Sequence, residues 1–488
     1  MAGHKKSKHK QNALKPQDDT IFALDIGTRT VVGVIGVQTE DSSGASVFDL
    51  QDYVVVPHTK RAMIDGQIED ARQVAKIVLQ AKEQLQARTG IKLKRVSISA
   101  SGHSIKTKRV TYETDVSAAG VITRDTIRSL ELEAIQQASA QINDERGVVT
   151  PYHCVGFSVI TYSLDGHKLF DFKFDESPKG TTAGVELVAT FLPNAVVDGL
   201  YSVMDMCSLT VENLILESVA AMNAVAPTET RFSNIALVDI GAGTSDIAVS
   251  KNGSIAAYAT ATISGDEITE MIIKSHFVDF DTAERIKQTC CSGEDCSYKD
   301  VFGIERFFNA KEFVERIKPI VETLATAICE NIIAANTTTP AVVFLVGGGS
   351  LVKGLPQAIS ANLSLPLDRV VVGSDGELKS INTNGKTLGA EMITPLGIAV
   401  TAMMKRESSA SVIAAPAPNT IKVTLNGDAV ELSPNANGSP HTFIELLNYI
   451  DLDLDDPQGK YFTMVNGKIA GFSDILKNGD EVVLEWQK

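Results

Sequence analysis

Long hydrophobic runs are missing from this chain of 488 residues. No apolar stretch approaches the roughly 18 to 20 residues that a membrane-spanning helix needs. The N-terminus also lacks the apolar segment of a secretory signal peptide. With 44% hydrophobic and 22% charged residues, the composition predicts a soluble protein that is not secreted and has several subdomains.

Cysteine is scarce as well, with six residues in the whole chain. Such sparse use is typical of reduced thiols in the cytosol. Cys290, Cys291 and Cys296 cluster in one short stretch, but no second C-x-x-C pair or histidine pair completes a zinc site. We interpret this stretch as a thiol-bearing loop.

The net charge of −15 at pH 7 argues against general nucleic-acid binding. Residues 1–16 depart from this balance, because they carry five lysines and no acidic residue. We expect residues 1–19 to be a disordered basic tail. The tail is either a solvated end or an electrostatic arm for anionic lipid or an acidic partner.

Residues 236–249 form the most informative motif, an apolar strand that enters a glycine-containing turn. Successive backbone N–H groups in such a turn cradle phosphate, and an aspartate at the strand's end holds a hydrated metal ion. The motif is not a Walker loop, because no Gly-Lys-Ser/Thr follows. It is not a dinucleotide fingerprint either, because Asp246 stands at the third glycine position and a strand, not a helix, follows. The residues that carry this prediction are Asp239, Gly241, Gly243 and Thr244.

Residues 21–35 repeat the same strand–turn–strand pattern. An apolar strand is followed by the sequence Asp25-Ile26-Gly27-Thr28 and then by a strand rich in β-branched residues. One Asp-Ile-Gly sequence would be weak evidence. Two copies, each followed by a threonine and a strand pattern, predict two similar half-domains that face each other over one ligand.

Three further segments contribute candidate site residues, each with a simpler structural interpretation. Glu217 is the acid of an apolar helix predicted over 214–225, where it either caps the helix or reaches a cleft and polarises water. Glu284 and Lys287 lie three apart on a predicted helix, which suits a surface ion pair or contacts to ribose and adenine. A glycine triplet follows a predicted buried strand, at Gly347, Gly348 and Gly349. It forms either a tight turn or a surface that binds a base or a phosphate.

The spacing of apolar residues divides the chain into predicted domains. Val185–Phe191 is expected as a core strand, and residues 304–335 as largely helical. The C-terminal segment has Asn-Gly turns and a strand–strand–helix–strand–strand order with a helix near 442–450, which indicates a β-grasp module. Its aspartates at 451–456 lack the glycine of a calcium loop, and we reject a calcium site there. We expect a first lobe over 20–95 and 179–230, an inserted α/β subdomain over 96–178, a second lobe over 231–388, a crossing helix over 389–405, a linker over 406–419, and the β-grasp module over 420–488.

The two Asp-Ile-Gly turns and the glycine triplet together resemble the phosphate-1, phosphate-2 and adenosine motifs of the actin-like ATPase superfamily. Within it, the order of elements over about 20–405 is most similar to the bacterial cell-division protein family FtsA. The resemblance implies a two-lobed α/β fold with ATP and Mg²⁺ between the lobes. It implies that Asp25 and Asp239 position Mg²⁺ and that Glu217 orients the attacking water. By the same resemblance the phosphates are held by Gly27, Thr28, Gly241, Gly243 and Thr244, and adenosine by Gly265, Glu284, Lys287, Gly347, Gly348 and Gly349. Arg29 adds a charge beside the phosphates.

The resemblance implies a division scaffold that self-associates into filaments with ATP and hydrolyses it slowly if at all. Its partners would be the tubulin-like division-ring protein FtsZ and other division proteins, at the inner face of the cell membrane. FtsA chains usually end in an amphipathic membrane helix, whereas a β-grasp module that we interpret as an interaction domain is expected here. Two other functions stay open: an ATP-binding protein of type IV pilus assembly, of the PilM kind, and a small-molecule kinase or chaperone-type ATPase.

Overall fold

The computed structural model describes most of the chain, namely residues 20–41, 43–58, 61–102, 104–117, 121–144, 151–169, 178–226, 230–374, 378, 380–410, 421–432, 441, 446, 460–470 and 476–487. The chain divides into two compact units, one of residues 1–122 and 133–404 and one of residues 123–132 and 405–488. The predicted tail over 1–19 and, apart from residue 446, the helix predicted near 442–450 lie outside the described residues. None of the helices in the described part is both long and apolar enough to span a membrane.

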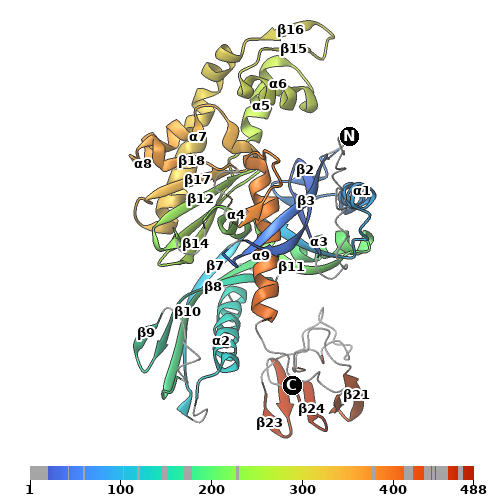
Figure 1. Cartoon of the computed structure of the whole chain (residues 1–488), viewed down its shortest axis with the longest axis vertical. Coiled ribbons are helices and arrows are strands. Elements are labelled where there is room, and N and C mark those ends of the chain that lie inside the picture. Colours follow the sequence, from blue (N-terminus) through green and yellow to red (C-terminus); the bar gives the residue numbers. More distant parts are fainter. Residues whose placement is uncertain are drawn as a thin grey trace, which may run out of the picture. The chain divides into compact units, whose positions relative to one another are not determined.

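The first lobe is built on a six-stranded sheet with the order β11-β6-β1-β2-β3-β19 (Figure 1). The first three strands of the chain pair antiparallel, and β6 lies parallel to β1 and to β11. Helices α1 and α3 cover one face and share an apolar core with it. The elements are β1 (Thr20–Ile26), β2 (Thr30–Glu40), β3 (Ser46–Pro57), β6 (Arg95–Ala100), β11 (Thr210–Leu216), β19 (Ile381–Asn382), α1 (Ala71–Thr89) and α3 (Asn194–Met206).

The second lobe repeats this arrangement in a five-stranded sheet with the order β14-β13-β12-β17-β18. Its strand β12 pairs antiparallel with β13 and parallel with β17, as β1 does with β2 and β6. Helix α7 packs its buried face against this sheet. The elements are β12 (Ile235–Ile240), β13 (Ser245–Lys251), β14 (Ser254–Ala261), β17 (Val342–Val346), β18 (Val370–Val372), α5 (Asp266–His276), α6 (Phe280–Ser292), α7 (Ala310–Asn336), α8 (Leu355–Leu363) and the hairpin of β15 (Cys296–Lys299) and β16 (Glu305–Phe308).

Two helices, α4 (Glu217–Val225) and α9 (Ile393–Ala410), connect the lobes. They share one buried apolar cluster with residues of both sheets, so each lobe contributes side chains to the same core. Figure 1 shows the two helices between the sheets. The predicted helix over 214–225 begins only at Glu217, because residues 214–216 complete β11. A short apolar run does not by itself distinguish the end of a buried strand from a helix.

The inserted subdomain is an antiparallel sheet with the order β7-β10-β8-β9. Its elements are β7 (Lys106–Asp115), β8 (Tyr152–Leu164), β9 (His167–Leu169), β10 (Thr182–Pro193) and, outside the sheet, α2 (Arg124–Asn143). Val185–Phe191 is a buried strand, as expected, but it belongs to β10, which lies between β7 and β8 and not in the sheet of the first lobe. A strand covered on both sides has the same apolar pattern in either sheet, so the pattern does not identify its neighbours.

The segment over 304–335 is largely helical, as expected, because α7 covers Ala310–Asn336, and β16 occupies Glu305–Phe308 before it. In the second unit, five strands form a sheet with the order β21-β20-β24-β22-β23, and β20 runs parallel to β24. They are β20 (Ile421–Leu425), β21 (Asp428–Leu432), β22 (Lys460–Val465), β23 (Lys468–Ile469) and β24 (Glu481–Gln487). The Asn426-Gly427 and Asn466-Gly467 turns have the positive φ values expected of tight hairpins. The β-grasp assignment stays a prediction.

Candidate functional site

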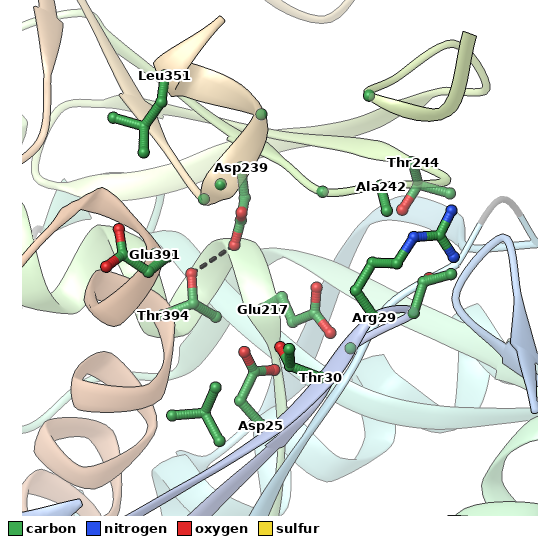
Figure 2. A pocket seen from close by; sticks show the side chains of 18 of the residues that line it. Asp25, Arg29, Thr30, Glu217, Asp239, Ala242, Thr244, Leu351, Glu391 and Thr394 are labelled. Atoms are coloured by element: carbon green, nitrogen blue, oxygen red, sulfur yellow. Dashed lines mark hydrogen bonds between the residues drawn. The ribbon is translucent and has the colours of Figure 1, made fainter. Parts of the chain in front are cut away.

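A cavity of about 500 Å³ opens between the two lobes, within the roughly 300 to 1,000 Å³ range of ligand pockets. Both glycine turns, the N-terminus of α4, the helices α6 and α9, and the glycine triplet contribute to its walls. Figure 2 shows the carboxylates of Asp25, Glu217 and Asp239 directed toward one space. Residues far apart in sequence therefore meet here because the two lobes carry the same strand–turn unit.

The two turns have the same internal geometry. The amide of Gly27 donates to the carbonyl of Thr30 over 3.0 Å, and the amide of Gly241 donates to that of Thr244 over 2.9 Å. Thr30 therefore corresponds to Thr244, and it also lines the cavity. The sequence prediction missed Thr30 because it matched the first threonine after each glycine, whereas equal distance from the glycine would have identified it.

His58 supports the first turn from outside the predicted set. Its amide donates to the carbonyl of Arg29 over 2.9 Å, and its Nε2 lies 3.1 Å from the carbonyl oxygen of Gly27. Burial lowers the pKa of His58, which favours the neutral imidazole. No sequence pattern near His58 indicated this contact.

Three acidic side chains face one another across the cavity. The hydroxyl of Ser99 donates to Asp25 Oδ1 over 2.8 Å and lies 3.5 Å from Glu217 Oε1. Burial, followed by the charge of Asp239, raises the pKa of Asp25 to about 7. Burial, followed by Asp25 and Asp239, raises the pKa of Glu217 well above its usual value. Carboxylates that repel one another in this way are stabilised by a cation placed between them.

Asp239 is held by a residue of the crossing helix α9. The hydroxyl of Thr394 donates to Asp239 Oδ2 over 2.5 Å (Figure 2). Burial raises the pKa of Asp239 to about 6, and the hydrogen bond from Thr394 opposes this rise. Behind it, Asp246 accepts from Thr260 over 2.7 Å, and burial raises the pKa of Asp246 to about 7. Thr394 lies among apolar residues at the start of α9, and its sequence context did not indicate a role.

The three glycines at 347–349 differ in what surrounds them. A β-carbon on Gly347, whose φ is +78°, would lie 2.4 Å from Asp239 Oδ1, and one on Gly349 would lie 2.4 Å from Ile240 Cγ2. These two glycines allow the turn to approach the end of β12. Gly348 has open space where a β-carbon would point, and it lines the cavity. Of these three glycines, all of which line the cavity, Gly348 is therefore the one beside open space.

Glu284 and Lys287 lie inside the cavity wall and not on the surface, with side chains 14% and 12% exposed. Lys287 Nζ lies 2.6 Å from Glu284 Oε1 and also donates to Thr269 Oγ1 over 2.8 Å and to the carbonyl of Gly265 over 3.1 Å. The interpretation as a solvated surface pair is therefore wrong. The bonds to Gly265 and Thr269 anchor α6 to the start of α5.

Arg29 reaches from the first turn to the second lobe. Its guanidinium forms an ion pair with Asp266, the first residue of α5, and lies 4.3 Å from the centroid of the Phe280 ring. The amide of Asp266 donates to the carbonyl of Ala242 over 2.9 Å, which ties α5 to the second turn. The two glycine turns are thus linked through Arg29 and Asp266.

All the predicted site residues line this cavity except Gly243. A β-carbon on Gly243 would lie 2.8 Å from the α-carbon of Asp65, in the turn between β4 (Met63–Ile64) and β5 (Gln67–Ile68). Gly243 therefore allows the lobes to approach each other and does not face the cavity. Further lining residues that the sequence prediction did not include are Thr30, Val32, Val55, Ser101, Ala242, Gln288, Leu351, Val352, Glu391 and Thr394.

The residues present fit a polyphosphate and a hydrated divalent cation. Among the described residues, no group of three or more His, Cys, Asp and Glu side chains is arranged to hold a metal ion. Mg²⁺ does not need such a cage, because it usually keeps several waters and binds one or two carboxylates together with phosphate oxygens. Asp25 and Asp239 provide two carboxylates, the glycine turns provide N–H groups, and Arg29 Nε is buried without a hydrogen-bond partner.

Comparisons with known proteins agree with this arrangement. The family model "Cell division protein FtsA" matches residues 236–393. The chain is 23% identical to the cell division protein FtsA of Pseudomonas aeruginosa, with 71% of this chain and 82% of the relative covered. It is 21% identical to that of Bacillus subtilis, with 69% and 75% covered.

Among solved structures, the PilM-PilN type IV pilus biogenesis complex superposes with a TM-score of 0.55 at 17% identity, covering 79% of this chain and 99% of that one. At this identity the superposition shows a shared fold. The α/β fold with two lobes, the family match and the curated relatives lead to one conclusion. The chain is similar in sequence to the FtsA cell-division proteins, and it has the fold of the actin-like ATPases.

Proposed function

We propose that this chain binds ATP with Mg²⁺ in the interlobe cavity and works as a nucleotide-dependent scaffold of the division machinery. In this proposal, ATP orders the two lobes so that successive copies stack into filaments. The filaments connect the division-ring protein FtsZ and other division proteins with the inner face of the membrane. The observation that supports it most is the pair of matching turns, with Asp25 and Asp239 at corresponding positions across one cavity.

The chain's own residues have distinct tasks in this proposal. The turn amides and Arg29 bind phosphate oxygens, while Asp25 and Asp239 hold the hydration shell of the ion. Bound Mg²⁺ supplies charge neutralisation at the phosphates. Glu217 lies at the N-terminus of α4 beside Asp25 and is placed to accept a proton from a water molecule. A switch needs only slow hydrolysis, because ATP shifts the lobes by its differential affinity for their two arrangements.

The test is a titration of the purified chain with a fluorescent ATP analogue, with and without Mg²⁺. We expect Mg²⁺-dependent binding in the wild type, and its loss in Asp239→Ala. Asp198→Asn, which removes an exposed acid of α3, serves as the control and should bind normally. Equal affinity of the wild type and Asp239→Ala would contradict the proposed site.

A second function is supported by one observation, the superposition on the PilM-PilN complex over 99% of that chain. A PilM-like protein would bind ATP in the same cavity and hold a peptide partner without forming filaments. Sedimentation with ATP and anionic vesicles separates the two. ATP-dependent pelleting supports the division scaffold, whereas ATP binding without pelleting supports the assembly-protein alternative.

A further inference from the structure

We infer that Arg29 exchanges partners when nucleotide binds, leaving Asp266 for the terminal phosphate, and so selects triphosphate over diphosphate. The inference rests on the proposed function and extends it. It assigns Arg29 two roles: an interlobe ion pair when the cavity is free of nucleotide, and a phosphate contact when nucleotide is present.

The position of Arg29 supports both roles. It belongs to the first phosphate turn and lines the cavity, and its ion-pair partner Asp266 belongs to the other lobe. The side chains of the pair are only 22% and 16% exposed. A phosphate bound between the two turns would therefore compete with Asp266 for the same guanidinium.

Arg29 is also the available cation of this cavity. The described residues that line it include two cations, Arg29 and Lys287. Lys287 already places its ammonium group against three acceptors, Gly265, Thr269 and Glu284, which matches its three N–H donors. Arg29, in contrast, has a buried Nε without a partner. A guanidinium also presents its donors in the planar fork that binds phosphate in a bidentate manner.

Asp266 is suited to release Arg29. It is the first residue of α5, and the positive end of a helix stabilises a carboxylate that loses its partner. The ring of Phe280, 4.3 Å from the guanidinium carbon, offers a face along which the guanidinium can turn without losing its cation–π contact. Arg61 lies 5.4 Å from the centroid of the same ring, so the ring has a second cation beside it.

The exchange predicts opposite effects for the two partners. Arg29→Ala removes the phosphate contact and should weaken ATP binding about tenfold or more, with a smaller effect on ADP. Asp266→Asn removes the competitor and should tighten ATP binding. In the double variant the gain should disappear, because Asp266 acts only through Arg29.

The experiment measures dissociation constants of fluorescent ATP and ADP analogues for the full chain. The variants are wild type, Arg29→Ala, Arg29→Lys, Asp266→Asn, the double variant and the control Lys274→Ala. Lys274→Ala removes a cation from α5 that pairs with Glu270 at the surface, and it should leave both affinities unchanged. Arg29→Lys should restore part of the ATP affinity, because it keeps the charge without the fork. Melting curves establish that each variant folds.

The outcomes separate the inference from the function on which it rests. Equal weakening of ATP and ADP by Arg29→Ala, or weaker ATP binding by Asp266→Asn, overturns the inference alone. If Arg29→Ala does not fold, the effect of Asp266→Asn on ATP affinity still tests the inference, because tighter binding supports it and weaker binding overturns it. A folded wild type that binds neither nucleotide overturns the proposed function and the inference with it.

Discussion

A β-carbon on Gly397 of α9 would lie 2.0 Å from the carbonyl oxygen of Ala220 on α4. The two connecting helices therefore cross with their backbones in contact, and only glycine fits at this crossing. A hydrogen bond of 2.8 Å from Asn223 Nδ2 to Thr401 Oγ1 joins the same helices one turn farther along. Because the crossing contributes to the core shared by both lobes, it sets how the two turns face each other.

We expect Gly397→Ala to destabilise the protein by about 2 kcal/mol or more, because the added methyl group forces the helices apart. Chemical denaturation monitored by circular dichroism measures this loss. Gly199→Ala in α3 is the matched control, since its β-carbon would meet only Ile68 Cδ1 at 3.9 Å. The control should be neutral or slightly stabilising, as alanine is the better helix former. Equal stability of the two variants would contradict the close crossing.

The glycine triplet gives a second pair of variants with opposite expectations. Gly347→Ala should lower stability and disturb Asp239, because the residue has a positive φ and its β-carbon would contact that carboxylate. Gly348→Val should fold normally, since the space around it is open, but it should weaken nucleotide binding by filling the cavity. Thermal melting and nucleotide titration of both variants test this division. A nucleotide affinity that Gly348→Val leaves unchanged would place the ligand elsewhere.

The hydrogen bond from Thr394 lowers the pKa of Asp239. Thr394→Val removes the hydroxyl that donates to Asp239 Oδ2, so the pKa of Asp239 should rise from about 6 toward neutrality. Mg²⁺-dependent nucleotide binding should then need a higher pH, because the ion requires the ionised carboxylate. Thr394→Ser keeps the hydroxyl and should match the wild type. The measurement is the pH dependence of the Mg-ATP dissociation constant, and identical profiles for both variants would count against this role.

The buried carboxylates predict an unusual pH dependence of stability without nucleotide. Burial raises the pKa values of Asp25 and Asp246 to about 7 and also raises that of Glu217. Between about pH 4 and 7 the folded chain therefore holds protons that the unfolded chain has lost. This difference reduces the free energy of unfolding as the pH rises through that window.

Glu217→Gln removes one of these groups, so the variant should melt at a higher temperature than the wild type at pH 7 to 8. Its free energy of unfolding should also fall less than that of the wild type between pH 5 and 7. Its ATP hydrolysis should fall at the same time, since the proton acceptor is gone. Differential scanning calorimetry across this range measures the first effect. A variant less stable than the wild type at pH 8 would show that Glu217 is compensated in the folded state.

Much of the local structure followed from residues that are close in sequence. Helix α1 (Ala71–Thr89) is one example, because Asp70 caps its start and Gly90, with a φ of 72°, its end. The two strand–turn–strand units around Asp25 and Asp239 were expected from their shared apolar pattern and glycines. All the proposed site residues except Gly243 line one cavity.

What was missed depends on contacts between distant segments. Thr394 reaches Asp239 across 155 positions of sequence, and Arg29 reaches Asp266 across 237. Neither a threonine in the first turn of a helix nor an arginine in a turn carries a local signal of its partner. Gly243 was expected to hold phosphate because it has the residue type of a phosphate turn, yet the turn at Asp65 lies against it.

Short-range forces control the apolar strands, the tight turns after Asp25 and Asp239, and the caps of helices such as α1, so these elements can be predicted from neighbouring residues alone. The tertiary structure decided which sheet receives β10, how close α4 and α9 approach, and which charges meet between the lobes. The physical reason is that backbone preference and apolar periodicity act within a few residues. Sheet pairing, the burial of carboxylates and the Arg29–Asp266 ion pair exist only after both lobes have folded onto their shared core.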